Sequence, residues 1–175
     1  WIFRPYPNNV GWNKGGQLQT QPLKQLLQPR SRQQQRLQDK GRQIRIFIKS
    51  KGILNVAEVQ VFSGADNIAS KAPPLKAVKN GVATNLAIDG NTDGIFDHKS
   101  VTHTQGNQSD PSWQLDLGRE LMLNEIIIWN RSDKAEYSDR LKNFTVQVLN
   151  AQQSVIWEKT IQEAPAPRVK LVPGQ

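Results

Sequence analysis

The chain has 175 residues, no cysteine and a formal net charge of +8. That length suits one ordinary domain with an appendage, and the lack of cysteine excludes both a disulfide framework and a thiolate zinc site. No apolar run approaches the roughly 18 to 20 residues of a membrane span. Because the chain opens on Trp1 rather than methionine, we expect it to be a piece of a longer protein.

The positive charge is confined to the front of the chain. Residues 1–50 contain ten Lys or Arg residues and one acidic residue, whereas residues 51–175 contain thirteen Lys or Arg and fourteen Asp or Glu. We therefore expect no nucleic-acid partner for the near-neutral main part. Binding of a nucleic acid or an anionic surface by residues 1–50 stays open as a weaker alternative.

The segment 1–41 is rich in Gln and Arg and is interrupted by Pro22 and Pro29. Such a composition does not supply a core, so we expect a flexible, partly helical linker or spacer. Its last eleven or so residues are long enough for a few helical turns, which we expect to end at Gly41 as the residue after the helix.

From residue 42 onward the apolar residues recur with period two. Ile44, Ile46 and Ile48 alternate with other residues, as in a half-buried strand. Six further short segments are rich in Ile, Val and Trp and are bounded by Gly, Asn, Asp or Pro. They read NVAEVQVF, SWQLDLG, LNEIIIWNR, NFTVQVLN, SVIWEKT and RVKLV. Residues 42–175 are thus expected to form an all-β sandwich. We expect three tryptophans within these segments to pack in its core: Trp113, Trp129 and Trp157.

A polar stretch, AIDGNTDGIFDHKSVTHT, separates the early strands from the later ones. Its DGNTDG element matches the first half of a calcium loop, and calcium requires several hard oxygen ligands. An EF-hand is excluded because its twelfth loop position is Ser100 rather than glutamate, and because strands rather than helices flank the loop. A plain turn rich in Asp and Asn stays open.

One imidazole and two guanidiniums lie in the loops of the expected sandwich, in SVTHT and NRSDKAEYSDRL. Such donors suit the hydroxyls and ring oxygen of a sugar, because the planar fork of Arg holds two oxygens at a fixed spacing. Each residue alone has a plainer interpretation. His103 can be a hydrogen-bonded loop residue, and Arg131 and Arg140 can pair with nearby acids.

These motifs together resemble the F-type lectins, or fucolectins. The matching pattern is NVAEVQVF, AIDGNTDG, SVTHT, PSWQLDLG, IIIWNRSD and DRL, and it covers roughly residues 42–175. The resemblance implies a jelly-roll β-sandwich of the galactose-binding-like class, which includes discoidin-type domains. It also implies a calcium-stabilised carbohydrate-binding module, with a fucose-type sugar as the leading ligand.

The resemblance further implies a setting for the domain. It is expected to be a targeting or recognition module attached to other domains of a large bacterial protein. That protein would be extracellular, or located in the cell envelope or periplasm. The competing interpretation is a scaffold or protein-interaction domain that keeps the fold and the calcium but binds no sugar.

The family's sugar-binding residues fall on His103, Arg131 and Arg140, with Asp133 and Tyr137 as possible further contacts. The match is imperfect here. The two arginines stand nine residues apart, farther than is usual in the family, and KAEYS replaces the family's cysteine pair. A longer loop can displace Arg140 from the site.

The family's calcium ligands can be carried over in the same way. The expected set combines side chains with backbone carbonyls: Leu86, Asp89, Asn91, Ser100, Ala57 and Glu58. A calcium ion between the carboxylates of Glu58 and Asp89 would remove the cost of burying both charges together.

We expect no enzymatic activity. A glycosidase needs two carboxyl groups at a defined separation. Asp93, Asp97 and Asp110 are available, but nothing in the sequence selects a pair among them. A Ser-His-Asp triad around His103 has no nucleophile-elbow motif to support it.

Overall fold

The computed structural model describes residues 11–12, 18–19, 40–72, 85–106 and 108–174. Almost all of its regular structure is β-strand, so the predicted all-β sandwich is confirmed. Within the front segment, β1 (Gly11–Trp12) pairs with β2 (Leu18–Gln19). The helical turns expected before Gly41, and most of the linker itself, lie outside the described residues. Among the described residues, no helix is long and apolar enough to cross a membrane.

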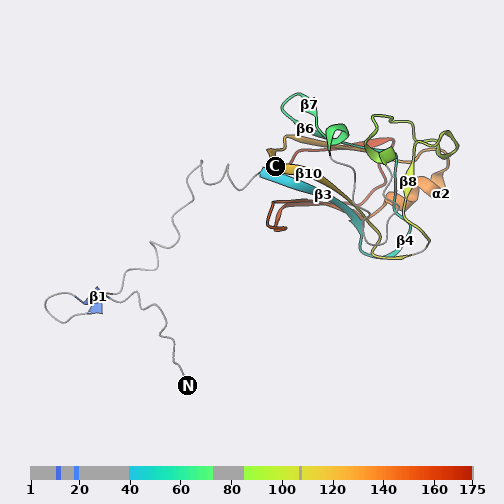
Figure 1. Ribbon diagram of the computed structural model, residues 1–175. Coiled ribbons are helices and arrows are strands. Elements are labelled where there is room, and N and C mark those ends of the chain that lie inside the picture. Colours follow the sequence, from blue (N-terminus) through green and yellow to red (C-terminus); the bar gives the residue numbers. More distant parts are fainter. Residues whose placement is uncertain (1–10, 13–17, 20–39, 73–84, 107, 175) are drawn as a thin grey trace, which may run out of the picture.

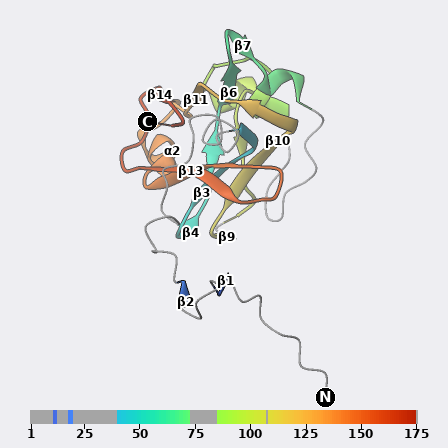
Figure 2. The same ribbon diagram turned by 90° about the vertical axis from the view of Figure 1, so that its left-hand side faces the viewer.

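Two four-stranded antiparallel sheets form the two layers (Figures 1 and 2). The first sheet has the order β10-β3-β12-β13. Its strands are β3 (Lys40–Ile48), β10 (Ser112–Met122), β12 (Phe144–Leu149) and β13 (Val155–Ile161). The second sheet has the order β14-β11-β6-β7. Its strands are β6 (Glu58–Ser63), β7 (Asp66–Asn67), β11 (Glu125–Trp129) and β14 (Arg168–Leu171).

The core lies between the two sheets because the period-two pattern places one apolar face of each sheet inward. In the first sheet, Ile46 is paired with Trp113 on one side and Val146 on the other. In the second sheet, Ile126 is paired with Val61 and Leu171. All of these side chains are at most 7% exposed. Register and burial therefore agree with the alternation of the sequence.

Gly41 does not end a helix, as the sequence suggested; it lies inside β3, opposite Leu121. A Cβ atom built on Gly41 would approach Val148 Cγ1 to 2.4 Å and Leu123 Cδ1 to 2.7 Å. The glycine is therefore used for close packing and not for a left-handed turn. The role expected for Gly41 was wrong because a glycine signals either role equally well.

The tryptophan expectation holds for one residue of the three. Trp113 is 6% exposed and packs in the core. Trp157 is only partly buried against the core from the edge strand β13. Trp129 faces outward from β11, where its Nε1 donates to Gln60 Oε1 at 3.3 Å and its ring lies under Arg168. Strand patterning places a tryptophan on a sheet but does not decide which face it occupies.

Short elements gather at one end of the sandwich, at the right in Figure 1. Two small antiparallel pairs lie there: β4 (Lys51–Gly52) with β9 (Gln108–Ser109), and β5 (Asn55–Val56) with β8 (Thr102–His103). The only α-helix in the described part of the chain is α2 (Ala135–Ser138), which continues into the 3₁₀ turn η5 (Asp139–Leu141). The polar stretch contains the 3₁₀ turns η3 (Asn85–Ile88) and η4 (Phe96–His98). This end positions the candidate site.

Candidate functional site

Loops from three parts of the chain surround an open pocket of about 430 Å³ at this end of the sandwich. All five residues expected to contact a sugar line it: His103, Arg131, Asp133, Tyr137 and Arg140. Six further residues complete the lining: Ile53, Phe96, Asp97, Thr104, Gly106 and Lys134. Side chains that are far apart in sequence are therefore brought together in one hollow.

Arg131 is the most buried charged side chain of the pocket, with 7% of the residue exposed. Its Nε donates to Asp133 Oδ1 at 2.5 Å and its Nη2 to Asp133 Oδ2 at 2.7 Å. This bidentate bond raises the pKa of Arg131 and lowers the pKa of Asp133. The pair uses one edge of the guanidinium, so the N–H groups of Nη1 and one of Nη2 stay available as donors.

Two aromatic rings hold the arginines. The Arg131 guanidinium carbon lies 4.5 Å from the ring centre of Phe96 and 4.0 Å from that of Tyr137. The Arg140 guanidinium carbon lies 4.5 Å from the Tyr137 ring. Such stacking fixes the plane of a guanidinium while leaving its N–H edge free for hydrogen bonds. Phe96 is 37% exposed and so adds an apolar surface to the pocket.

The tautomer of His103 follows from its neighbour. Its Nδ1 lies 3.0 Å from the carbonyl oxygen of Thr104. A carbonyl only accepts hydrogen bonds, so Nδ1 carries the proton and donates it. In the neutral ring Nε2 is then an acceptor, which suits the hydroxyl hydrogen of a ligand. The His103 ring also lies against Phe96, with ring centres 5.6 Å apart and planes inclined by 49°.

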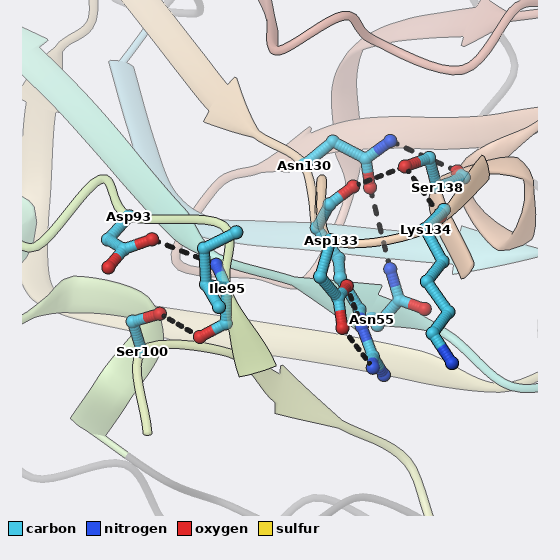
Figure 3. Close-up of polar contacts among 9 residues, drawn as sticks. Asn55, Asp93, Ile95, Ser100, Asn130, Asp133, Lys134 and Ser138 are labelled. Carbon is cyan, nitrogen blue, oxygen red and sulfur yellow. Dashed lines mark hydrogen bonds and ion pairs between the residues drawn. The ribbon is translucent and has the colours of Figure 1, made fainter. Parts of the chain in front are cut away.

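Hydrogen bonds of buried polar groups hold the long loop between Arg131 and Arg140 in place (Figure 3). Asn130 is 1% exposed, and its Nδ2 donates to the carbonyls of Ser138 at 3.0 Å and Pro165 at 3.1 Å. Asn55 Nδ2 lies 3.4 Å from Asn130 Oδ1, and Ser138 Oγ donates to the Arg131 carbonyl at 2.7 Å. The extra residues form α2 and η5, and Arg140 therefore returns to the pocket.

A second charged centre lies at Glu58, which is 0% exposed at the start of β6. Its Oε1 accepts from the Gly90 N–H at 3.2 Å, whereas its Oε2 has no hydrogen-bond partner within the described part of the chain. Burial raises the pKa of Glu58 to about 8, and the nearby charge of Asp89 adds to this increase. Glu58 is therefore a buried carboxyl whose second oxygen is left to an outside group.

The other expected calcium ligands are distributed around the same loop. Asp89 Oδ1 accepts from the Asn91 N–H at 2.8 Å, and both residues are exposed. Ser100 is 0% exposed and its Oγ donates to the Ile95 carbonyl at 2.9 Å. The turn η3, which contains Leu86, packs on β6. Ala57 precedes Glu58 and is buried, with its N–H donating to the Trp129 carbonyl at 2.9 Å.

This loop is also ordered by its own side chains. Asn91 Oδ1 accepts from the Asp93 N–H at 3.0 Å and Asp93 Oδ1 from the Ile95 N–H at 2.9 Å, so successive Asx turns follow one another. No cluster of three or more His, Cys, Asp or Glu side chains occurs among the described residues. The expected calcium set contains only two carboxylates and relies on neutral oxygens for the rest.

The pocket at Arg131 and the loop next to Glu58 are in contact at Gly94. The Ser132 N–H donates to the Gly94 carbonyl at 2.9 Å. A Cβ atom on Gly94 would lie 2.4 Å from Ser132 Oγ and 2.7 Å from the Asn130 carbonyl oxygen. The loop that begins at Asp89 is thus packed directly against the strand end that carries Arg131.

Sequence reasoning missed Phe96, Lys134 and the pair formed by Asn55 and Asn130. Phe96 carried a usable signal, since it is an aromatic residue within an otherwise polar loop. Lys134 stands beside residues that were singled out, but a lysine in a polar loop signals nothing by itself. The two asparagines are 75 positions apart, so only the fold shows that they meet.

Comparison with known proteins points to the galactose-binding-like class. Residues 86–170 match the family described as the NedA-like, galactose-binding domain. Fucolectin-6 of Anguilla japonica is 47% identical over 47 residues, which are 27% of this chain and 25% of that protein. The fucolectin of Anguilla anguilla is 44% identical over 54 residues, which are 31% of this chain and 33% of that protein.

A third relative, Fucolectin-2 of Anguilla japonica, is 35% identical over 66 residues, covering 37% of this chain and 36% of that protein. The chain thus spans between a quarter and just over a third of the length of these curated relatives. No solved structure gave a significant match.

Fold and pocket together define a two-layer β-sandwich with an open hollow built on its loops. Residues 86–170 of this sandwich match the galactose-binding-like class, and shorter stretches are similar to the eel fucolectins.

Proposed function

We propose that this domain binds carbohydrate in the pocket lined by His103, Arg131 and Arg140. The observation that carries the proposal is the convergence of these side chains, from separate loops, on one open hollow beside exposed aromatic surface. Sugars combine hydroxyls with apolar C–H faces, and the pocket offers hydrogen-bond donors, a histidine acceptor and two rings. The names of the eel relatives support the same class of ligand.

A fucose-type sugar is the leading ligand. It carries adjacent hydroxyls, a ring oxygen and one methyl group. The free edge of Arg131 and the fork of Arg140 can donate to the oxygens, and His103 Nε2 can accept from a hydroxyl. The methyl group or a C–H face can then pack on Phe96 or Tyr137. The proposed role is binding and not catalysis, because Asp133 is engaged on both carboxylate oxygens by Arg131.

Calcium is the second part of the proposal. The buried Glu58 carboxyl with one oxygen lacking a partner in the described structure is the feature that a cation would satisfy. Glu58, Asp89, Asn91 and Ser100 would hold the ion, together with the carbonyls of Ala57 and Leu86, as oxygen ligands of the kind calcium takes. When bound, the ion would supply charge neutralisation at Glu58 and would fix the base of the loop that leads to Phe96 and His103.

The test uses two arginines that are stacked on aromatic rings in the same way. Arg140 lies 4.5 Å from the Tyr137 ring inside the pocket, and Arg168 lies 4.8 Å from the Trp129 ring outside it. In calorimetric titrations with L-fucose and D-galactose in calcium, we expect Arg140→Ala to weaken binding by tenfold or more and Arg168→Ala to leave it unchanged. Equal effects of the two substitutions would refute the placement of the site.

The wider role follows from the same proposal. The domain would serve as a recognition module of a larger protein, extracellular or in a cell envelope, with residues 1–41 as its linker. The competing role is a scaffold that keeps the fold and the calcium but binds no sugar. Absence of binding to any sugar on a glycan array, in a sample that calcium still stabilises, would favour the scaffold.

A further inference from the structure

The pocket has more cationic side chains than its carboxylates neutralise by ion pairing. Three cationic side chains line it, Arg131, Lys134 and Arg140, against two acidic ones, Asp97 and Asp133. Asp133 is held on both oxygens by Arg131. Within the described part of the chain, neither Lys134 nor Arg140 forms an ion pair with a carboxylate.

The two unpaired cations are held over one ring. Lys134 Nζ lies 5.5 Å and the Arg140 guanidinium carbon 4.5 Å from the ring centre of Tyr137. The ring orients both side chains but carries no net charge, so their charges are not neutralised. Lys and Arg only donate hydrogen bonds, which leaves up to eight N–H groups without a fixed acceptor beside the hydroxyl-binding groups.

Nearby acids do not cancel this charge. Asp97 lines the pocket but acts on Arg131, where its charge helps to raise the pKa of the guanidinium. Asp139 is bound to Lys142 at 3.1 Å. Glu136 is exposed on α2 and does not line the pocket. The side of the pocket at Tyr137 therefore carries two cationic side chains that no carboxylate among the described residues pairs with, next to the proposed sugar site.

We propose that the pocket selects a sugar bearing an anionic substituent, a sulfate ester or a carboxylate, and that Lys134 and Arg140 hold this substituent. The inference rests on the proposed carbohydrate function of the same pocket. The planar fork of Arg140 matches two oxygens of either group, and Lys134 adds a compact point charge. Lys134 thereby determines specificity, whereas His103, Arg131 and the remaining N–H groups of Arg140 bind the hydroxyls common to charged and neutral sugars.

The experiment compares matched sugars by calorimetry, using the full chain in calcium at low salt. The probes are methyl α-L-fucoside with each of its mono-O-sulfate esters, and D-galactose with D-galacturonate. We expect at least one charged sugar to bind roughly fivefold tighter than its neutral parent, a preference that shrinks as salt is added. Preference for a sulfate ester alone or for galacturonate alone identifies which anionic group the surface takes.

Two lysine variants of equal net charge make the test specific. Lys134→Gln should lower the ratio of charged to neutral affinity severalfold. Lys159→Gln, on the exposed strand β13 away from the pocket, should keep the ratio. A preference that survives Lys134→Gln, or equal affinity for charged and neutral sugars, overturns the inference and leaves the proposed function standing. Absence of binding to every sugar, charged or neutral, overturns the proposed function itself.

Discussion

Arg131 and Glu58 are both buried ionisable residues at the same end of the sandwich, and their surroundings differ. Arg131 has its own carboxylate, Asp133, at 2.5 and 2.7 Å. Glu58 accepts a hydrogen bond from the Gly90 N–H on one oxygen, and its second oxygen has no hydrogen-bond partner among the described residues. Burying a charge is costly unless it is paired. Arg131 is thus paired within the chain, whereas Glu58 is the carboxyl that the proposed calcium ion would satisfy.

The difference assigns the two centres different tasks. The satisfied pair keeps one guanidinium edge fixed toward the pocket, which is what a ligand-binding group requires. The unsatisfied carboxyl raises the free energy of the folded state, and under the calcium proposal a bound cation would offset this cost. Gly94 and Ser132 connect the two centres, so we expect a structural change at one centre to alter the geometry of the other.

The largest expected effect is that of removing the paired arginine. Arg131→Ala leaves Asp133 without its partner and both Phe96 and Tyr137 without the group they stack on. Breaking a buried ion pair costs about 3 kcal/mol in the free energy of unfolding, and sugar binding should be lost as well. Denaturant unfolding measures the first and calorimetry the second. Arg131→Ala with parental stability would show that the pair contributes little.

Calcium binding at Glu58 should change the free energy of unfolding by a similar amount. At a concentration one hundred times its Kd, a cation bound only to the folded state adds about 2.7 kcal/mol to the free energy of unfolding. Parent protein should therefore melt at higher temperature in calcium than in chelator. Glu58→Gln should reduce this difference strongly, and in chelator it should be at least as stable as the parent at neutral pH.

Glu58→Gln should be at least as stable as the parent in chelator because of the direction in which burial changes the pKa of Glu58. Burial raises the pKa of Glu58, so its charged form is disfavoured in the folded protein above the unfolded value of 4.5. Removing that charge removes the penalty. If Glu58→Gln responds to calcium as the parent does, Glu58 is not a ligand.

Gly94→Ala tests the contact between the two centres. The new methyl group would lie 2.4 Å from Ser132 Oγ and 2.7 Å from the Asn130 carbonyl oxygen. Forcing the segments apart should cost about 1 to 3 kcal/mol and should weaken both calcium-dependent stabilisation and sugar binding. Gly52→Ala is the matched control, because a Cβ atom there meets nothing within 4 Å. Equal thermal melting of the two variants would argue against the contact.

The smallest effect is a pH dependence at Asp133. Arg131 lowers the pKa of Asp133, so the pair stabilises the fold above the usual pKa of 3.8 and loses this contribution as pH falls through the lowered folded value. Asp133→Asn should therefore destabilise the protein by about 1 kcal/mol at pH 7 and by less in strong acid. A stability difference that is independent of pH would exclude an ionic origin.

The sandwich could be predicted from the sequence because its signal is local. Ile44, Ile46 and Ile48 alternate along one strand and are all buried, although Phe47 on the other face is buried as well. Gly41 could not be assigned, because close packing against Leu123 and Val148 depends on residues distant in the chain. Trp129 was misplaced for a similar reason, since its partners Gln60 and Arg168 come from neighbouring strands.

The residues of the pocket could be predicted from the sequence, but the contacts between them could not. A recognisable motif pattern picked out His103, Arg131 and Arg140, whereas the stacking of the arginines on Phe96 and Tyr137 required the fold. The lengthened loop is accommodated by four residues of helix and a buried asparagine, Asn130. Propensity gives no account of so short a helix, because tertiary hydrogen bonds stabilise it.

The central claim is that this hollow holds a sugar, and the measurement to make is an NMR titration of the calcium-loaded protein with L-fucose and its sulfate esters. Backbone and side-chain signals of residues 96–97, 103–106 and 131–140 should shift together and saturate. Signals from β7 and β13 should stay in place. Shifts confined to other surfaces, or no shift at all in a protein that calcium still stabilises, would contradict the central claim.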